Sequence, residues 1–137
     1  MKRKNIKIET KLIREGLNRT NFSETSEPIF MTSSYVYDSP EQAEARFKGD
    51  DDGFIYSRYG NPTVKVFEDR LASIEGGEKC FATSTGMAAV FSSMMCFLEQ
   101  GDKIVASRAL FGSCYQILTK IFPKYGISTT FVSGKNI

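Results

Sequence analysis

The chain has 137 residues and a formal net charge of +2, with 41% hydrophobic and 25% charged residues. This length is enough for one domain with a core, and these proportions are those of an ordinary globular protein. So small a charge, with no basic stripe interleaved with aromatic residues, argues against a nucleic-acid partner. No stretch approaches the length of a membrane span, and no apolar run follows the basic start Met1–Lys4, so neither a membrane segment nor a secretory signal is predicted.

The first 60 residues are irregular in pattern, with one clear short helix. Ser39, Pro40 and Gln42 form a helix start, and we expect the helix to continue to Phe47. The following segment, residues 49–53, combines turn formers with three aspartates. A solvated loop is the first interpretation of this acidic cluster, and a metal site is the remote alternative.

From residue 61 onward, helical and strand patterns alternate. Asn61 and Pro62 are typical of an N-cap and a first helical residue, ahead of a helix with Val64, Phe67, Leu71 and Ile74 on one stripe. The predicted elements are a helix over 63–75, a strand over 79–83, a helix over 86–100, a strand over 103–106, a helix over 114–122 and a strand over 127–132. This order predicts an α/β fold with parallel strands, right-handed crossovers and flanking helices.

Parallel sheets are normally covered on both faces and contain several more strands than these three. We therefore interpret residues 61–137 as the incomplete front part of a larger α/β domain. A complete small domain is the alternative.

Cysteine usage points to a reducing compartment. Cys80, Cys96 and Cys114 are odd in number and widely spaced, and the sequence has no histidine, so no zinc site is predicted. We expect buried free thiols and a cytoplasmic protein.

Tyr56 and Arg58 are the first candidate ligand-binding residues. Two positions apart in an extended segment, they project from the same side. Arginine offers a fork of donors that matches phosphate oxygens, and tyrosine adds one hydroxyl donor. For Tyr-x-Arg taken alone, an ordinary surface loop is the better interpretation.

The loop over residues 83–88 is the second candidate, because ligands of such sheets bind where strands lead into helices. Its small hydroxyl residues and Gly86 let the backbone approach a ligand, and the next helix offers free N–H groups to a phosphate. An ordinary turn capped by Ser84 or Thr85 is at least as good an interpretation of this loop alone. Neither nucleotide-binding glycine pattern occurs here.

Phe111 is the third candidate, since it follows a predicted strand and its ring could stack on a flat heterocycle. From the residues alone, packing in the core is the better interpretation.

Taken together, the run Tyr56-Ser57-Arg58-Tyr59-Gly60-Asn61-Pro62-Thr63 and the loop Ser84-Thr85-Gly86-Met87-Ala88-Ala89 resemble the pyridoxal-phosphate enzymes of cysteine and methionine metabolism. The resemblance implies the large domain of a PLP-dependent transferase of fold type I, the aspartate-aminotransferase-like class. It implies that Tyr56 and Arg58 bind the cofactor phosphate of the neighbouring subunit. It also implies that Thr85, Gly86 and Met87 form the phosphate cradle, with Phe111 over the cofactor ring.

The same resemblance divides the chain and implies its assembly. Residues 1–60 would contribute to the neighbouring subunit and its active site, and residues 61–137 would begin the PLP-binding large domain. The full-length protein would be a homotetramer, a dimer of dimers.

The sequence Leu110-Phe111-Gly112-Ser113-Cys114 looks more like the O-succinylhomoserine sulfhydrylase branch, because most family members carry tyrosine where Phe111 stands. This branch implies γ-replacement on O-succinylhomoserine by sulfide, giving homocysteine for methionine biosynthesis by trans-sulfuration. Cystathionine γ-synthase is the first alternative, and a methionine or cystathionine γ-lyase is the next.

No catalytic residue is assigned within this chain. In the family, the Schiff-base lysine lies in a Ser-x-Thr-Lys turn, beyond the position of Ile137. Lys120 follows Thr119 but lies inside a predicted helix, with Ile117 where the serine would stand. The chain alone is therefore expected to be inactive, and a non-catalytic fragment or binding module is the alternative of a different class.

Overall fold

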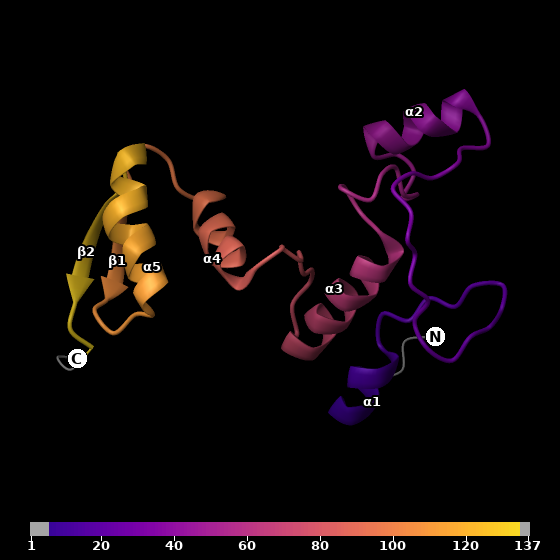
Figure 1. Ribbon diagram of the computed structural model, residues 1–137, viewed down its shortest axis with the longest axis horizontal. Helices are drawn as coiled ribbons and strands as arrows, with labels where there is room; N and C mark the ends of the chain where they lie inside the picture. The colour runs from indigo at the N-terminus through magenta and orange to yellow at the C-terminus, as the bar shows by residue number, and fades with distance from the viewer. Residues whose placement is uncertain (1–5, 135–137) are drawn as a thin grey trace. The chain divides into compact units, whose positions relative to one another are not determined.

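The computed structural model describes residues 6–134, which form two compact units that meet in sequence between Ala82 and Thr83 (Figure 1). The basic start of the chain, residues 1–4, lies outside the described residues. The elements are α1 (Ile8–Arg14), α2 (Pro40–Lys48), α3 (Pro62–Glu75), α4 (Gly86–Met95), β1 (Lys103–Ser107), α5 (Gly112–Gln116) and β2 (Ser128–Val132). A π-helical segment, Ile117–Ile121, and a 3-10 turn, Phe122–Tyr125, continue α5 toward β2. Among residues 6–134, no helix is long and apolar enough to cross a membrane.

The predicted helix starts in the first unit are confirmed. The N–H of Gln42 donates to Ser39 Oγ at 3.2 Å, and Gln42 Oε1 accepts from the N–H of Asp38 at 2.7 Å. These bonds cap α2, which extends one residue beyond Phe47 before Gly49 ends it in the left-handed conformation. In the acidic loop that follows, Asp51 Oδ1 accepts from the N–H of Gly53 at 2.7 Å and pairs with Arg46 Nε at 3.3 Å.

Helix α1 was not predicted, since residues 1–60 were expected to hold one helix. It has seven residues, no side-chain cap and no buried residue, so no local signal marks it. Contacts with α3 hold it instead: Arg70 Nε donates to the carbonyl of Glu15 at 2.9 Å, and Lys11 Nζ donates to that of Ser73 at 3.3 Å. Gly16 follows with φ +73°, where an added Cβ would lie 2.6 Å from the carbonyl oxygen of Val66.

The second unit contains two parallel strands that are joined through a helix. β1 and β2 pair in parallel, with Lys103 opposite Ser128 and Ser107 opposite Val132, and α5 lies alongside them (Figure 1). The buried core is formed by Ile117, Leu118, Phe122 and Ile127, and apolar residues of α4 pack against it. The predicted α/β class and the last two predicted strands are confirmed.

The predicted strand over 79–83 is wrong, because this segment has no regular secondary structure. A strand needs a neighbour for its backbone bonds, and here the N–H of Ala82 donates to the carboxylate of Glu68 at 2.7 Å. Phe81 is 80% exposed, so the apolar run does not enter the core of either unit. The sheet of the described residues therefore has two strands.

Two predicted helix boundaries are also corrected. α4 ends at Met95 instead of Gln100, because the carboxylate of Asp102 accepts from the N–H of Glu99 at 2.8 Å and fixes a turn. The helix predicted over 114–122 begins at Gly112 and continues to Tyr125 through the π-helical and 3-10 segments. Thr119 Oγ1 donates to the carbonyl of Tyr115 at 2.8 Å within this segment, and Pro123 lacks the N–H that a regular helix would use.

Two expectations about burial are only partly met. All three cysteines are free thiols, but Cys96 is exposed at the end of α4, and Cys80 and Cys114 are half-buried. On the predicted stripe of α3, Val64 and Phe67 are exposed, while the buried residue of this helix is Ala72. The face of α3 that contacts α1 is the one that carries Arg70 and Ser73.

The ion pair of Arg70 with Glu27 gives the first unit a dependence on pH. The hydrogen bond from Arg70 lowers the pKa of Glu27 below its ordinary value of 4.5. A lowered carboxyl pKa in the folded state stabilises the fold above that ordinary value, and the contribution disappears as the pH falls through the folded-state pKa. Glu27→Gln should therefore reduce the free energy of unfolding at pH 7, and the difference from the unsubstituted protein should shrink toward pH 3.

Urea unfolding of the full-length protein at both pH values would measure this difference. Glu44→Gln is the matched control, because Glu44 forms an exposed pair with Lys48 and surface pairs contribute little. A loss for Glu27→Gln that does not change with pH would contradict the assignment.

Candidate functional site

Tyr56 and Arg58 lie on a tight turn instead of the expected extended segment. The N–H groups of Tyr59 and Gly60 both donate to the carbonyl of Tyr56, at 2.8 and 3.1 Å. The turn still brings the two candidate side chains together, with the guanidinium of Arg58 5.6 Å from the centre of the Tyr56 ring. An isolated antiparallel bridge between Ser34 and Tyr56 fixes where the turn begins.

The hydroxyl of Ser57 anchors this turn to the rest of the first unit. It donates to the carbonyl of Thr32, and it accepts from Asn61 Nδ2 at 3.0 Å. The hydroxyl of Tyr35 lies 3.2 Å away, and the N–H of Ser57 donates to the carbonyl of Ser33 at 2.9 Å. Four contacts from one residue thus hold the loop between Tyr56 and Arg58, a role the sequence did not reveal.

Asn61 connects the turn to α3. Its Oδ1 accepts from the N–H of Thr63 at 2.9 Å, which confirms the predicted N-cap. Its Nδ2 donates to Ser57 and also to the carbonyl of Phe30 at 3.0 Å, and the residue is 9% exposed. A buried amide whose polar atoms are all bonded has one orientation, so the turn and the helix share one fixed joint.

The start of α4 carries the second group of candidates. Thr85 is its N-cap, with Oγ1 accepting from the N–H of Ala88 at 3.0 Å. Among residues 6–134, no partner is found for the backbone N–H groups of Gly86 and Met87. No atom lies within 4 Å of where a Cβ on Gly86 would be, so the backbone there is open to a ligand. Two unpaired N–H groups at the positive end of a helix dipole are the chemistry that binds phosphate.

Phe111 immediately precedes α5, at the carboxyl end of β1. The residue is 72% exposed, so the structure excludes the core packing that its sequence context favoured. An exposed ring at this edge is available to stack on a flat ligand. Met87 and Ser113 line one open hollow of about 500 Å³ between α4 and the helix that follows Phe111.

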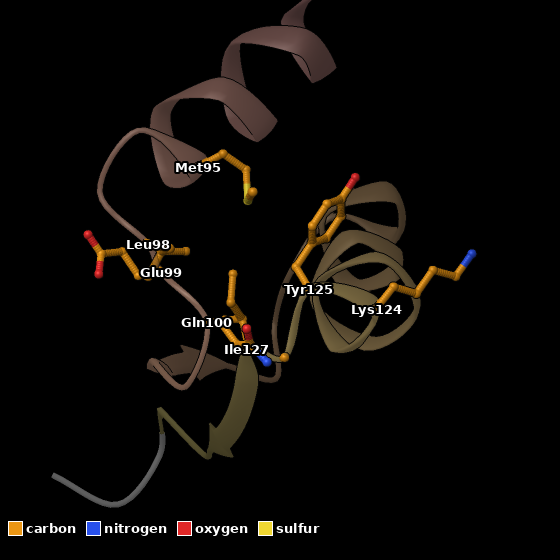
Figure 2. A pocket seen from close by; sticks show the side chains of 8 residues that line it. Met95, Leu98, Glu99, Gln100, Lys124, Tyr125 and Ile127 are labelled. Atoms are coloured by element: carbon orange, nitrogen blue, oxygen red, sulfur yellow. The ribbon is translucent and has the colours of Figure 1, made fainter.

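A different hollow lies at the opposite end of the two strands from Phe111. Figure 2 shows this space of about 400 Å³, where Met95, Tyr125 and Ile127 face one another and the charged ends of Glu99 and Lys124 point away. Ile127 comes just before β2, so the hollow is at the amino end of the strands. Ligands of parallel sheets bind at the carboxyl ends, so we do not assign it to the candidate site.

Lys120 is exposed on the π-helical segment and Thr119 bonds the helix backbone, so the structure offers no reason to give this lysine a catalytic role. Among residues 6–134, no group of three metal-ligating side chains is found. Tyr56 and Arg58 belong to the first unit, and Thr85, Gly86, Met87 and Phe111 belong to the second.

Comparison with known proteins places the chain among pyridoxal-phosphate enzymes. The family described as Cys/Met metabolism PLP-dependent enzyme matches residues 9–137, and the chain belongs to this family. The resemblance drawn from the two motifs is thereby confirmed, as is pyridoxal phosphate as the cofactor of the family.

Among curated relatives, the O-succinylhomoserine sulfhydrylase of Mycobacterium tuberculosis (strain H37Rv) is 50% identical over 125 residues, covering 91% of this chain and 31% of that protein. The O-succinylhomoserine sulfhydrylase of Pseudomonas aeruginosa is 42% identical, covering 90% of this chain and 31% of that protein. The L-methionine gamma-lyase of Fusobacterium nucleatum subsp. polymorphum is 35% identical, covering all of this chain and 35% of that protein. The chain spans about a third of the length of these relatives.

Solved structures confirm the fold. A Campylobacter jejuni protein described as an O-acetylhomoserine (thiol)-lyase matches with a TM-score of 0.89 and 30% identity, covering 94% of this chain and 32% of that protein. That structure contains N'-pyridoxyl-lysine-5'-monophosphate. The metB protein of Corynebacterium glutamicum matches with a TM-score of 0.83 and 26% identity, covering 93% of this chain and 32% of that protein.

The cap of α4 can be tested independently of any ligand. Thr85→Ala should lower the free energy of unfolding by about 1 kcal/mol, because the N–H of Ala88 loses its side-chain acceptor. Thr85→Ser keeps the hydroxyl and should retain most of that stability. Urea unfolding of the full-length, cofactor-free protein would measure both, and equal losses in the two variants would show that the hydroxyl does not act as the cap.

Proposed function

We propose that the full-length protein catalyses γ-replacement on O-succinyl-L-homoserine, with sulfide as the incoming nucleophile and L-homocysteine and succinate as the products. The observation that carries the proposal is the similarity to sulfhydrylases, at 50% and 42% identity, compared with 35% for the methionine γ-lyase. Phe111 favours the same branch, since a phenyl ring has no hydroxyl with which to move a proton. Cystathionine γ-synthase, which would use cysteine in place of sulfide, is the alternative.

When bound, pyridoxal phosphate withdraws electrons from the amino-acid substrate and so makes loss of the γ-substituent feasible. The role of the residues in this chain is to hold the cofactor. The N–H groups of Gly86 and Met87 would donate to phosphate oxygens, and the hydroxyl of Thr85, whose oxygen accepts from Ala88, keeps its own proton to donate. The exposed ring of Phe111 would cover one face of the pyridine ring.

Tyr56 and Arg58 would complete the phosphate site of a neighbouring subunit. Both side chains are exposed, and Arg58 has no carboxylate partner among residues 6–134, so its donors are available to an anion. Exposed apolar side chains of the first unit, Phe22, Met31 and Val36, support packing against another subunit. The homotetramer and the cytoplasmic location stay predictions.

Arg58→Ala in the full-length protein should weaken the affinity for pyridoxal phosphate by about 10- to 100-fold, since a hydrogen bond to a charged group contributes about 1.5–3 kcal/mol. Titration of the cofactor-free protein with pyridoxal phosphate would measure the dissociation constant. Lys48→Ala, which removes an exposed cation of the same unit, should leave it unchanged. Equal affinities for Arg58→Ala and the unsubstituted protein would refute the assignment of Arg58.

The reaction itself is tested by supplying O-succinyl-L-homoserine to the full-length protein with sulfide, with cysteine, or with neither. We expect homocysteine and succinate with sulfide as the fastest turnover. Turnover with cysteine alone would identify a cystathionine γ-synthase. Release of ammonia and a 2-oxo acid without any added nucleophile, as the main reaction, would identify a γ-lyase.

A further inference from the structure

The aromatic ring of Tyr59 supports the guanidinium of Arg58. The central carbon of the guanidinium lies 4.8 Å from the centre of the Tyr59 ring, closer than its 5.6 Å from the centre of the Tyr56 ring. The N–H of Tyr59 donates to the carbonyl of Tyr56 at 2.8 Å, so the turn fixes the backbone position from which the Tyr59 ring extends. Arg58 thus rests on the aromatic side chains of its own turn.

Arg58 differs from the arginines that stabilise the first unit in its hydrogen bonds. Arg14, Arg19, Arg46 and Arg70 each donate to at least one oxygen of the protein. Among residues 6–134, Arg58 donates to none, and its ring contacts are its interactions.

Stacking and hydrogen bonding use different parts of a guanidinium. The contact with a ring uses the face of the group, whereas its five N–H donors point outward in its plane. A guanidinium whose contacts are with rings keeps its donors for an anion, and a side chain already in contact has less conformational freedom to lose on binding. Tyr59 is 66% exposed, and no hydrogen bond of its hydroxyl is found within residues 6–134, so the contribution belongs to the ring.

We propose that Tyr59 is a positioning residue, whose ring holds Arg58 ready to bind the cofactor phosphate. This inference rests on the proposed function, in which Arg58 binds that phosphate. It adds a residue to which neither the motif resemblance nor the predicted site gave a role.

The test compares two ligands and four variants of the full-length, cofactor-free protein: Tyr59→Leu, Tyr59→Phe, Arg58→Ala and the double variant Arg58→Ala/Tyr59→Leu. Tyr59→Leu keeps apolar bulk but removes the ring, and should raise the dissociation constant for pyridoxal phosphate about 3- to 10-fold. Tyr59→Phe keeps the ring and should match the unsubstituted protein. Affinity for pyridoxal, which lacks the phosphate, should not change in either variant.

The double variant separates positioning from a general structural effect. If Tyr59 acts through Arg58, Tyr59→Leu should cause no further weakening once Arg58 is alanine. Additive losses, or equal losses for pyridoxal and pyridoxal phosphate, would overturn the inference. So would a Tyr59→Leu protein with unchanged affinity while Arg58→Ala weakens binding, an outcome that leaves the proposed function standing. If Arg58→Ala leaves the affinity for pyridoxal phosphate unchanged, Arg58 does not bind the phosphate, and the inference about Tyr59 is refuted as well.

Discussion

The side-chain amide of Asn61 is the joint on which the first candidate group depends. It caps α3 through Thr63, and it holds the turn of Tyr56 and Arg58 through Ser57. Because the residue is 9% exposed, breaking either contact would leave buried polar atoms without partners. One buried amide therefore specifies both where a helix begins and where a fork of cationic donors is presented. Local contacts fix the geometry of this turn without a large core.

The second candidate group depends on a different constraint, the free N–H groups that every helix leaves at its start. Thr85 accepts from the N–H of Ala88, and the two preceding N–H groups, of Gly86 and Met87, stay open to a ligand within the described part of the chain. The strands beside this helix have one face packed on the core, whereas Val105 on the other face is 70% exposed. Parallel sheets are normally covered on both faces, and the relatives of this chain are about three times its length. The exposed strand face thus fits a chain that spans a third of its relatives.

Elements with local signals could be predicted from the sequence, and elements held by distant contacts could not. Asn61 and Pro62 predict the start of α3, because the cap bond joins two residues, Asn61 and Thr63, that are two positions apart in the sequence. α1 has no cap and relies on Arg70, more than fifty residues away in the sequence. The strand expected over 79–83 does not form. An apolar run is typical of a buried strand, but a strand also needs a neighbouring strand for its backbone hydrogen bonds. At the candidate site, the residue types of Arg58 and Gly86 predict phosphate chemistry, but the contact of the Tyr59 ring with Arg58 depends on the geometry of the turn.

The most direct test of the central claim is a crystal structure of the full-length protein with pyridoxal phosphate bound. We expect the phosphate oxygens about 3 Å from the backbone nitrogens of Gly86 and Met87 of one subunit. We expect the same phosphate to accept hydrogen bonds from Tyr56 and Arg58 of a neighbouring subunit. A phosphate bound elsewhere, or Tyr56 and Arg58 facing solvent in the assembled protein, would contradict the account.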